Sequence, residues 1–246
     1  MHIYKPAEEK SLGYILSRFL ETIAQDLRTE ALPSVLEALV AINDNIILNK
    51  PLPPIVHCFA LDDDSTNSIV NILKEQLASH SAVDMKRLNS PITYMLDELI
   101  CNIQQHAQTE KGYAYTGYDK ETNTIEIVIA DSGITIYGSY VFTQKYLEHI
   151  GNSDAAALNL ARNGYSTKNL PNSENRGYGI SSNIQMIVNG LHGEVAVLSG
   201  NALLAHFKDK KKILSLPNEI DFKGTIIIIR IPSTAPADFD LYKYMY

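Results

Sequence analysis

The segment PITYMLDELICNIQQHAQ, residues 91–108, is the part of the sequence that decides the expected fold. Its apolar residues recur at intervals of three and four, which predicts a helix from about Pro91 to Gln108 with Ser90 as its cap. The apolar stripe consists of Leu96, Leu99, Ile100, Ile103 and Ala107, and the polar stripe beside it consists of Glu98, Asn102, Gln105 and His106. We expect the helix to bury one face and to present a row of polar groups beside it.

The polar stripe has a chemical interpretation. Residues four apart on a helix share a face, so Glu98, Asn102 and His106 would project into one site. A carboxylate can take a proton from a hydroxyl or a water, and an amide oxygen is a hard ligand that suits Mg²⁺. A solvated polar face would have the same spacing, so this segment alone leaves both interpretations open.

Two strand-like runs, residues 113–118 and 124–130, follow the helix and predict a hairpin with residues 119–123 as its turn. The second run leads into Ala130-Asp131-Ser-Gly133-Ile134. The Asp131 carboxylate can accept a hydrogen bond from an exocyclic amine such as adenine N6, and Gly133 lets a flat ring approach the backbone. An ordinary turn at the end of a strand is the alternative.

Two glycine elements lie further along the chain. In Arg176-Gly-Tyr-Gly-Ile180, the glycines expose backbone N–H groups before a predicted helix, whose N-terminus adds positive potential that suits phosphate. A bare helix start is the alternative for this element. Gly224-Thr225 leads into the last apolar strand and means little by itself.

The remaining chain alternates between helical and strand patterns. Two amphipathic helices are predicted between Leu12 and Asn49, before the prolines at 51, 53 and 54. Residues 137–173 form a long excursion with a short helix or two, which is typical of a lid. Further strands are predicted at 55–61, 194–198, 202–207 and 225–231, further helices at 67–79 and from about 179, and a charged hairpin at 208–212.

The four elements, taken in order and with their strand or helix context, resemble the N, G1, G2 and C-terminal Gly-Thr elements of the GHKL (histidine kinase-like) ATPase superfamily. Residues 55–107 are most similar to its anti-sigma-factor serine kinase branch, and the resemblance covers about Pro54 to Pro232. It implies an α+β fold: a two-layer α/β sandwich of the Bergerat type, with a mixed sheet and helices on one face. It also implies ATP and Mg²⁺ bound between the helices and a lid.

The resemblance implies a role for each matching residue. Glu98 falls at the general base, Asn102 at the Mg²⁺ ligand, Asp131 at the carboxylate that reads adenine, and Gly133 at the glycine beside it. Thr225 falls at the hydroxyl that supports this carboxylate through water. The other implied ATP-binding residues are His106, Arg176, Gly177, Tyr178, Gly179 and Ile180, together with Lys168 in the lid-like segment Gly164-Tyr-Ser-Thr-Lys168. Lys168 is either a ligand of the terminal phosphate or a surface lysine.

One position departs from the family pattern. The G1 element of the family is commonly DxGxG, whereas here Thr135 takes the place of the last glycine. A threonine makes this loop stiffer than a glycine would. We expect the change to affect lid motion more than adenine binding.

Composition excludes several classes of function. The 246 residues are 45% hydrophobic and 20% charged, which is typical of a globular protein. A net charge of −7 argues against nucleic acid as the main partner. The two cysteines, Cys58 and Cys101, fit reduced thiols in a cytoplasmic protein. No secretory signal and no apolar run of about 18 residues are present, so we expect no membrane association.

We expect an N-terminal helical region (1–52), a histidine kinase-like ATPase domain (53–232) and a C-terminal tail (233–246). The first region lies outside the resemblance and is a candidate for homodimerisation, partner binding or signal input. The resemblance implies an enzyme of bacterial-type regulation that transfers the terminal phosphoryl group of Mg-ATP to a protein serine or threonine, or hydrolyses ATP slowly. The alternative is a non-catalytic, nucleotide-gated switch that binds a regulatory protein. Glu98 favours the enzyme, because a switch without turnover needs no general base. Thr135 favours the switch, and so does the lack of a domain with the phosphoacceptor histidine motif of a histidine kinase.

Overall fold

A computed structural model describes residues 41–42, 45, 51–167, 180–207, 210–216 and 222–245. The chain divides into two compact units, Met1–Val56 and His57–Tyr246. Of the two helices predicted between Leu12 and Asn49, only Ala41, Ile42 and Asn45 are described, and all three are helical. The second unit and the strand that leads into it contain almost all of the described residues.

Seven strands form one sheet in the order β1-β2-β3-β7-β4-β5-β6. Their bounds are Val56–Ala60 (β1), Lys111–Asp119 (β2), Thr124–Asp131 (β3), Glu194–Gly200 (β4), Ala202–Phe207 (β5), Lys210–Ser215 (β6) and Phe222–Pro232 (β7). The predicted hairpin is confirmed, because β2 and β3 pair antiparallel with Asp119 opposite Thr124. The lysines at 210–212 are exposed in the edge strand β6 rather than in a hairpin turn, and charges there hinder edge-to-edge association.

The α+β fold with helices against one sheet is as expected, but the sheet is antiparallel rather than mixed. The pairs β2–β3, β3–β7, β7–β4, β4–β5 and β5–β6 are all antiparallel. Strands β3 and β4 are connected through helices and run in the same direction. Because β7 lies between them and runs opposite to both, they do not become parallel neighbours.

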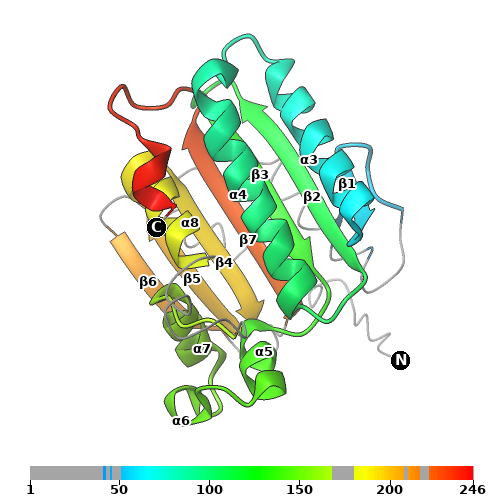
Figure 1. The fold of residues 1–246 in the computed structure, drawn as a ribbon, viewed down its shortest axis with the longest axis vertical. Coiled ribbons are helices and arrows are strands. Elements are labelled where there is room, and N and C mark those ends of the chain that lie inside the picture. Colours follow the sequence, from blue (N-terminus) through cyan, green and yellow to red (C-terminus); the bar gives the residue numbers. More distant parts are fainter. Residues whose placement is uncertain are drawn as a thin grey trace, which may run out of the picture. The chain divides into compact units, whose positions relative to one another are not determined.

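Helices α3 (Asp63–Ala78), α4 (Met85–His106) and α8 (Ile180–Gln185) lie across one face of the sheet (Figure 1). Helix α3 begins earlier than predicted because Asp62 caps it, accepting a hydrogen bond from the Ser65 N–H. Helix α4 also begins earlier, after Asp84 instead of Ser90, and Pro91 lies inside it. The preceding turn contributes Leu88, which is fully buried, so packing extends the helix beyond the boundary that proline suggested.

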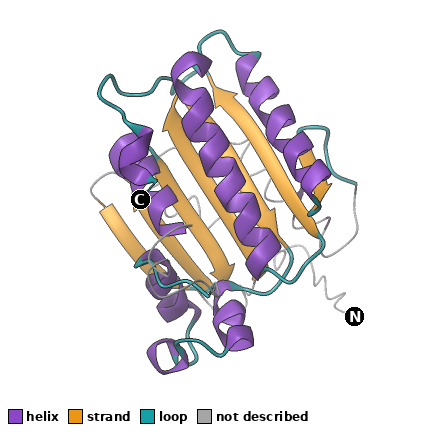
Figure 2. Cartoon of the chain, viewed as in Figure 1, coloured by secondary structure: helices purple, strands orange, loops and turns teal. Residues whose placement is uncertain are grey.

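Up to Thr167, where the description breaks off, the predicted excursion after β3 contains three helices, α5 (Ile136–Thr143), α6 (Leu147–Ile150) and α7 (Asp154–Arg162). Figure 2 shows α5 and α6 beyond one end of the sheet. Helix α7 packs against β5, β6 and α8, and its Leu158 belongs to the hydrophobic core. Helix α8 continues into a π-helical turn, η1 (Met186–Gly190). A short 3₁₀ helix, η2 (Leu241–Tyr244), ends the described chain.

The main core lies between the sheet and the helical layer. Alternate isoleucines of β3 and β7 face it and meet the apolar stripe of α4 and the buried face of α3; the fully or almost fully buried members include Leu73, Leu77, Leu88, Ile92, Leu96, Leu99, Ile125, Ile127, Ile129, Ile229 and Ile231. Each such side chain contributes about 1.5–3 kcal/mol by leaving water. In the part of the chain described, we find no helix with the length and apolar character of a membrane span.

The C-terminal residues pack on this helical layer. The Arg87 guanidinium donates to the carbonyls of Pro236 and Ala237, at 2.8 and 2.9 Å. The rings of Phe239 and Tyr244 stack with centroids 6.1 Å apart. Both rings lie so close to Gly190 that a Cβ at this position would collide with them. The aromatic pair can therefore pack against the π-helical turn because residue 190 is a glycine.

Candidate functional site

A cavity opens where the end of α4 meets the end of β3. It has about 760 Å³ of empty space when its open mouth is included. The cavity brings together five residues predicted from the sequence, namely Asn102, His106, Asp131, Ile180 and Thr225. These residues come from α4, β3, α8 and β7, so the fold unites elements that are far apart in the chain.

Asp131 is the buried carboxylate of this cavity. It is the last residue of β3, is only 4% exposed, and accepts a hydrogen bond of 2.9 Å from the Gly133 N–H. Burial raises the pKa of Asp131 from 3.8 to about 7, and backbone hydrogen bonds from Gly133 and Thr225 oppose the rise. A carboxylate that titrates near neutrality inside a cavity is a candidate ligand-binding group.

Two glycines beside Asp131 are required by close packing. A Cβ on Gly133 would collide with the carbonyl oxygen of Ala107, to which the Ile134 N–H donates at 2.6 Å. Gly224 has a φ of +116°, and a Cβ there would collide with the Asp131 carbonyl oxygen. Gly133 therefore ties the loop to the end of α4 and does not line the cavity within the described residues. The expected role of Gly133 beside a ligand stays a prediction.

Ser199 joins the G1 loop to the last strand, and sequence analysis missed it. Its hydroxyl lies 3.1 Å from the Thr225 hydroxyl, donates to the Gly224 carbonyl and accepts a hydrogen bond from the Ile136 N–H. The antiparallel register of β4 and β7 places Ser199 directly opposite Thr225. That register follows from β7 inserting between β3 and β4, which local sequence does not reveal.

Thr135, the departure from the family pattern, begins a helix. Its side chain accepts a hydrogen bond from the Gly138 N–H at 3.0 Å and so caps α5. Threonine is a favoured N-cap residue, whereas a glycine would leave this N–H without a side-chain partner. The G1 loop therefore passes directly into α5.

The three residues of α4 predicted to belong to the site, Glu98, Asn102 and His106, differ in their surroundings. Asn102 and His106 line the cavity, whereas Glu98 is not among the described residues that do. The buried Glu98 Oε2 and Asn102 Nδ2 have no hydrogen-bond partner in the part of the chain that the structure describes. An unpaired buried polar group costs about 1–3 kcal/mol, so a ligand that pairs with these atoms would recover that energy.

The wall opposite α4 consists of residues from α5 and from the segment after α7. The Thr167 hydroxyl lies 2.9 Å from His106 Nδ1 and 3.0 Å from the Ser139 hydroxyl. The Tyr140 hydroxyl donates to the Tyr165 carbonyl at 2.5 Å. Of these lining residues, sequence analysis singled out only His106 and the segment Gly164–Lys168 to which Tyr165 and Thr167 belong.

The rest of the predicted phosphate-binding set lies outside the described residues. It comprises Lys168, Arg176, Gly177, Tyr178 and Gly179. Ile180, the next residue, is the first of α8 and lines the cavity.

The donor set can be compared with the groups that the resemblance implies. Among the described residues there is no group of three or more His, Cys, Asp or Glu side chains suited to a metal ion. Mg²⁺ needs no such cage, because it keeps waters and binds through few protein oxygens together with phosphates. The Asn102 amide and the neighbouring Glu98 carboxylate fit this mode, and Asp131 fits an exocyclic amine.

Comparisons of the chain with protein-family models, curated proteins and solved structures found no match. Membership of the GHKL superfamily therefore stays a prediction from sequence pattern.

Proposed function

We propose that this protein binds ATP in the manner of histidine kinase-like ATPases, and transfers its terminal phosphoryl group to a protein serine or threonine or hydrolyses it slowly. The observation that carries the proposal is the buried Asp131 carboxylate, held by Gly133 and Thr225 in a cavity that Asn102 and His106 also line. An adenine exocyclic amine is a donor that this carboxylate can accept from.

The residues of α4 would supply the chemistry. Asn102 would hold Mg²⁺ through its amide oxygen, and the ion would neutralise charge on the phosphates. Glu98 lies one turn before Asn102 and would take the proton of the attacking hydroxyl or water. The unpaired Glu98 Oε2 supports its assignment as the base, and the unpaired Asn102 Nδ2 is a donor that suits a phosphate oxygen.

Calorimetric and thermal-unfolding titrations with Mg-ATP test the binding site. ATP at about 100 times its Kd should stabilise the wild type by roughly 2.7 kcal/mol. Asp131→Asn should lose most of this effect, and GTP should give none, because guanine presents a carbonyl where adenine presents its amine. Asp97→Asn, the same change on the exposed side of α4, is the matched control and should bind ATP normally. The absence of any ATP response in the wild type would refute the proposal.

A second function, a nucleotide-gated switch without turnover, is favoured by one observation. Glu98 is not among the described residues that line the cavity. A carboxylate outside the cavity is less able to deprotonate the group that attacks a bound phosphate, and without a base the protein would bind ATP without turnover. Glu98→Gln separates the two functions. Loss of turnover with ATP binding intact supports the enzyme, whereas a wild type that binds ATP without turnover supports the switch.

We further propose a cytoplasmic location and a regulatory protein as partner or substrate. Within the described residues, neither Cys58 nor Cys101 forms a disulfide, which fits a reducing compartment. A protein partner follows from either proposed function, because phosphoryl transfer requires an acceptor protein and a nucleotide-gated switch acts by binding another protein.

A further inference from the structure

Thr167 occupies an unusual position in the candidate site. Its hydroxyl lies between the His106 imidazole and the Ser139 hydroxyl, and all three residues line the same cavity as Asp131. A hydroxyl within hydrogen-bond reach of an imidazole nitrogen is the arrangement of a nucleophile with its base. The proposed function gives Thr167 no role.

The backbone on both sides of Thr167 is held in place. The Tyr140 hydroxyl donates to the Tyr165 carbonyl, and the Lys145 ammonium donates to the Thr167 carbonyl at 3.2 Å. Tyr140 is almost fully buried, so it fixes this segment against α5. Such anchoring pre-organises the hydroxyl toward the cavity and reduces the entropy lost on reaching a reactive geometry.

We infer that Thr167 is a phosphorylation site of this chain, modified in cis by the ATP bound in its own cavity. The inference rests on the proposed function, since the cavity must first hold Mg-ATP. Thr167 Oγ1 would form a bond to the γ-phosphorus while the bond from that phosphorus to the β,γ-bridging oxygen breaks. ADP leaves with the electron pair, and the hydroxyl proton passes to His106 Nδ1 in the tautomer that leaves this nitrogen unprotonated.

The surroundings of Thr167 also suit the product. The His106 imidazole, protonated after the transfer, contacts the hydroxyl that would carry the new phosphate, and the Lys145 ammonium contacts the carbonyl of the same residue. Charge-assisted hydrogen bonds from such groups stabilise a phosphothreonine. The added negative charge would repel a second ATP from the same cavity, so the modification would limit nucleotide binding.

The test is to incubate the full-length protein with Mg-ATP and to locate phosphate by intact mass and peptide mapping. One phosphoryl group on Thr167 is expected, with a rate constant independent of protein concentration because the reaction is intramolecular. Thr167→Val should abolish the modification, and Thr167→Ser should keep it on the new hydroxyl. His106→Gln, which cannot act as the base, should slow it by about 10²-fold or more.

Thr143→Val is the matched control. Thr143 lies on the neighbouring helix α5 and its hydroxyl donates to the Ser139 carbonyl, but it does not line the cavity within the described residues. This variant should be modified at the wild-type rate. ATP binding without phosphate on Thr167, or a rate constant that rises with protein concentration, would overturn the inference and leave the proposed function standing. A failure to bind ATP would overturn both.

Discussion

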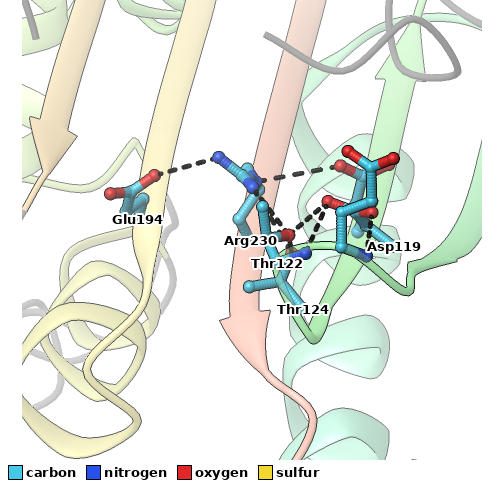
Figure 3. Close-up of polar contacts among 7 residues, drawn as sticks. Asp119, Thr122, Thr124, Glu194 and Arg230 are labelled. Atoms are coloured by element: carbon cyan, nitrogen blue, oxygen red, sulfur yellow. Dashed lines mark hydrogen bonds and ion pairs between the residues drawn. The ribbon is translucent and has the colours of Figure 1, made fainter. Parts of the chain in front are cut away.

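Arg230 of β7 lies directly opposite Glu126 of β3, with Nε 3.8 Å from Oε1, at a position where the glutamate is only 1% exposed. On its other side the same guanidinium faces Glu194 of β4, 3.6 Å away. Figure 3 shows the cluster, which also includes hydrogen bonds from Arg230 to Thr122 and Thr124 in the β2–β3 connection and at the start of β3. One cation therefore joins the three central strands of the sheet.

Arg230→Met should destabilise the protein strongly. It leaves two buried or nearly buried carboxylates facing each other across β7, and removing one partner of a buried ion pair typically costs about 3–5 kcal/mol. Urea denaturation measures the loss. The triple variant that also carries Glu126→Gln and Glu194→Gln should regain much of the stability, because two like charges no longer face each other across β7. A single variant as stable as the wild type would contradict this account.

Asp131→Asn should raise stability while it weakens ATP binding. Because the folded-state pKa of Asp131 is about 7 and its ordinary value is 3.8, the native protein holds this proton more tightly than the unfolded chain. Stability from this group is therefore lost as pH rises from about 4 to 7, by a few kcal/mol in all. The Tm advantage of the variant should grow over that range and level off above it. A constant difference at every pH would rule out the titration of Asp131 as its cause.

Nucleoside affinity should fall as the solution becomes acidic. The acceptor form of Asp131 is the ionised carboxylate, so below about pH 7 the ligand must displace a proton. The Kd should rise by up to about tenfold for each pH unit below this value. Adenosine is the probe of choice in calorimetry, because it lacks the phosphates that titrate in the same range. An affinity independent of pH would show that Asp131 does not bind as the anion.

Gly224→Ala should destabilise more than Gly151→Ala. Both glycines have positive φ, +116° and +51°, so alanine is strained at each. Only at Gly224 does the added Cβ also collide with the Asp131 carbonyl oxygen, whereas nothing lies within 4 Å of a Cβ at Gly151. Chemical denaturation of the two variants isolates the collision. We also expect Gly224→Ala to impair ATP binding, since the collision displaces β3 at Asp131.

Local pattern predicted the main elements because their own residues carry the signal. The hairpin β2–β3 has strand-like runs on both sides of a polar turn, and α4 has a continuous apolar stripe. The start of α4 was wrong because Pro91 suggests a boundary, whereas burial of Leu88 extends the helix past it. The antiparallel sheet was missed because it depends on where β7 inserts, which is a non-local choice.

The residues of the candidate site also fall into two groups, those that local sequence predicts and those that only the tertiary structure reveals. Asn102, His106 and Asp131 were predicted because each belongs to a short motif with a recognisable chemistry, whereas Thr225 was predicted only through the family resemblance. Ser199, Ser139 and Thr167 were not, since a lone hydroxyl residue gains a role only when another element is brought within hydrogen-bond distance of it.

The sequence by itself determined most of the helices and strands, which helix face is buried, and which polar residues are candidates for chemistry, because these depend on periodicity and residue type. Only the tertiary structure decided that Asp131 is buried enough to titrate near neutrality. The tertiary structure also explains why positions 133 and 224 require glycine: a backbone carbonyl of another segment lies where a Cβ atom would be. Burial and close approach are properties of segments packed together from distant parts of the chain, and no local pattern contains them.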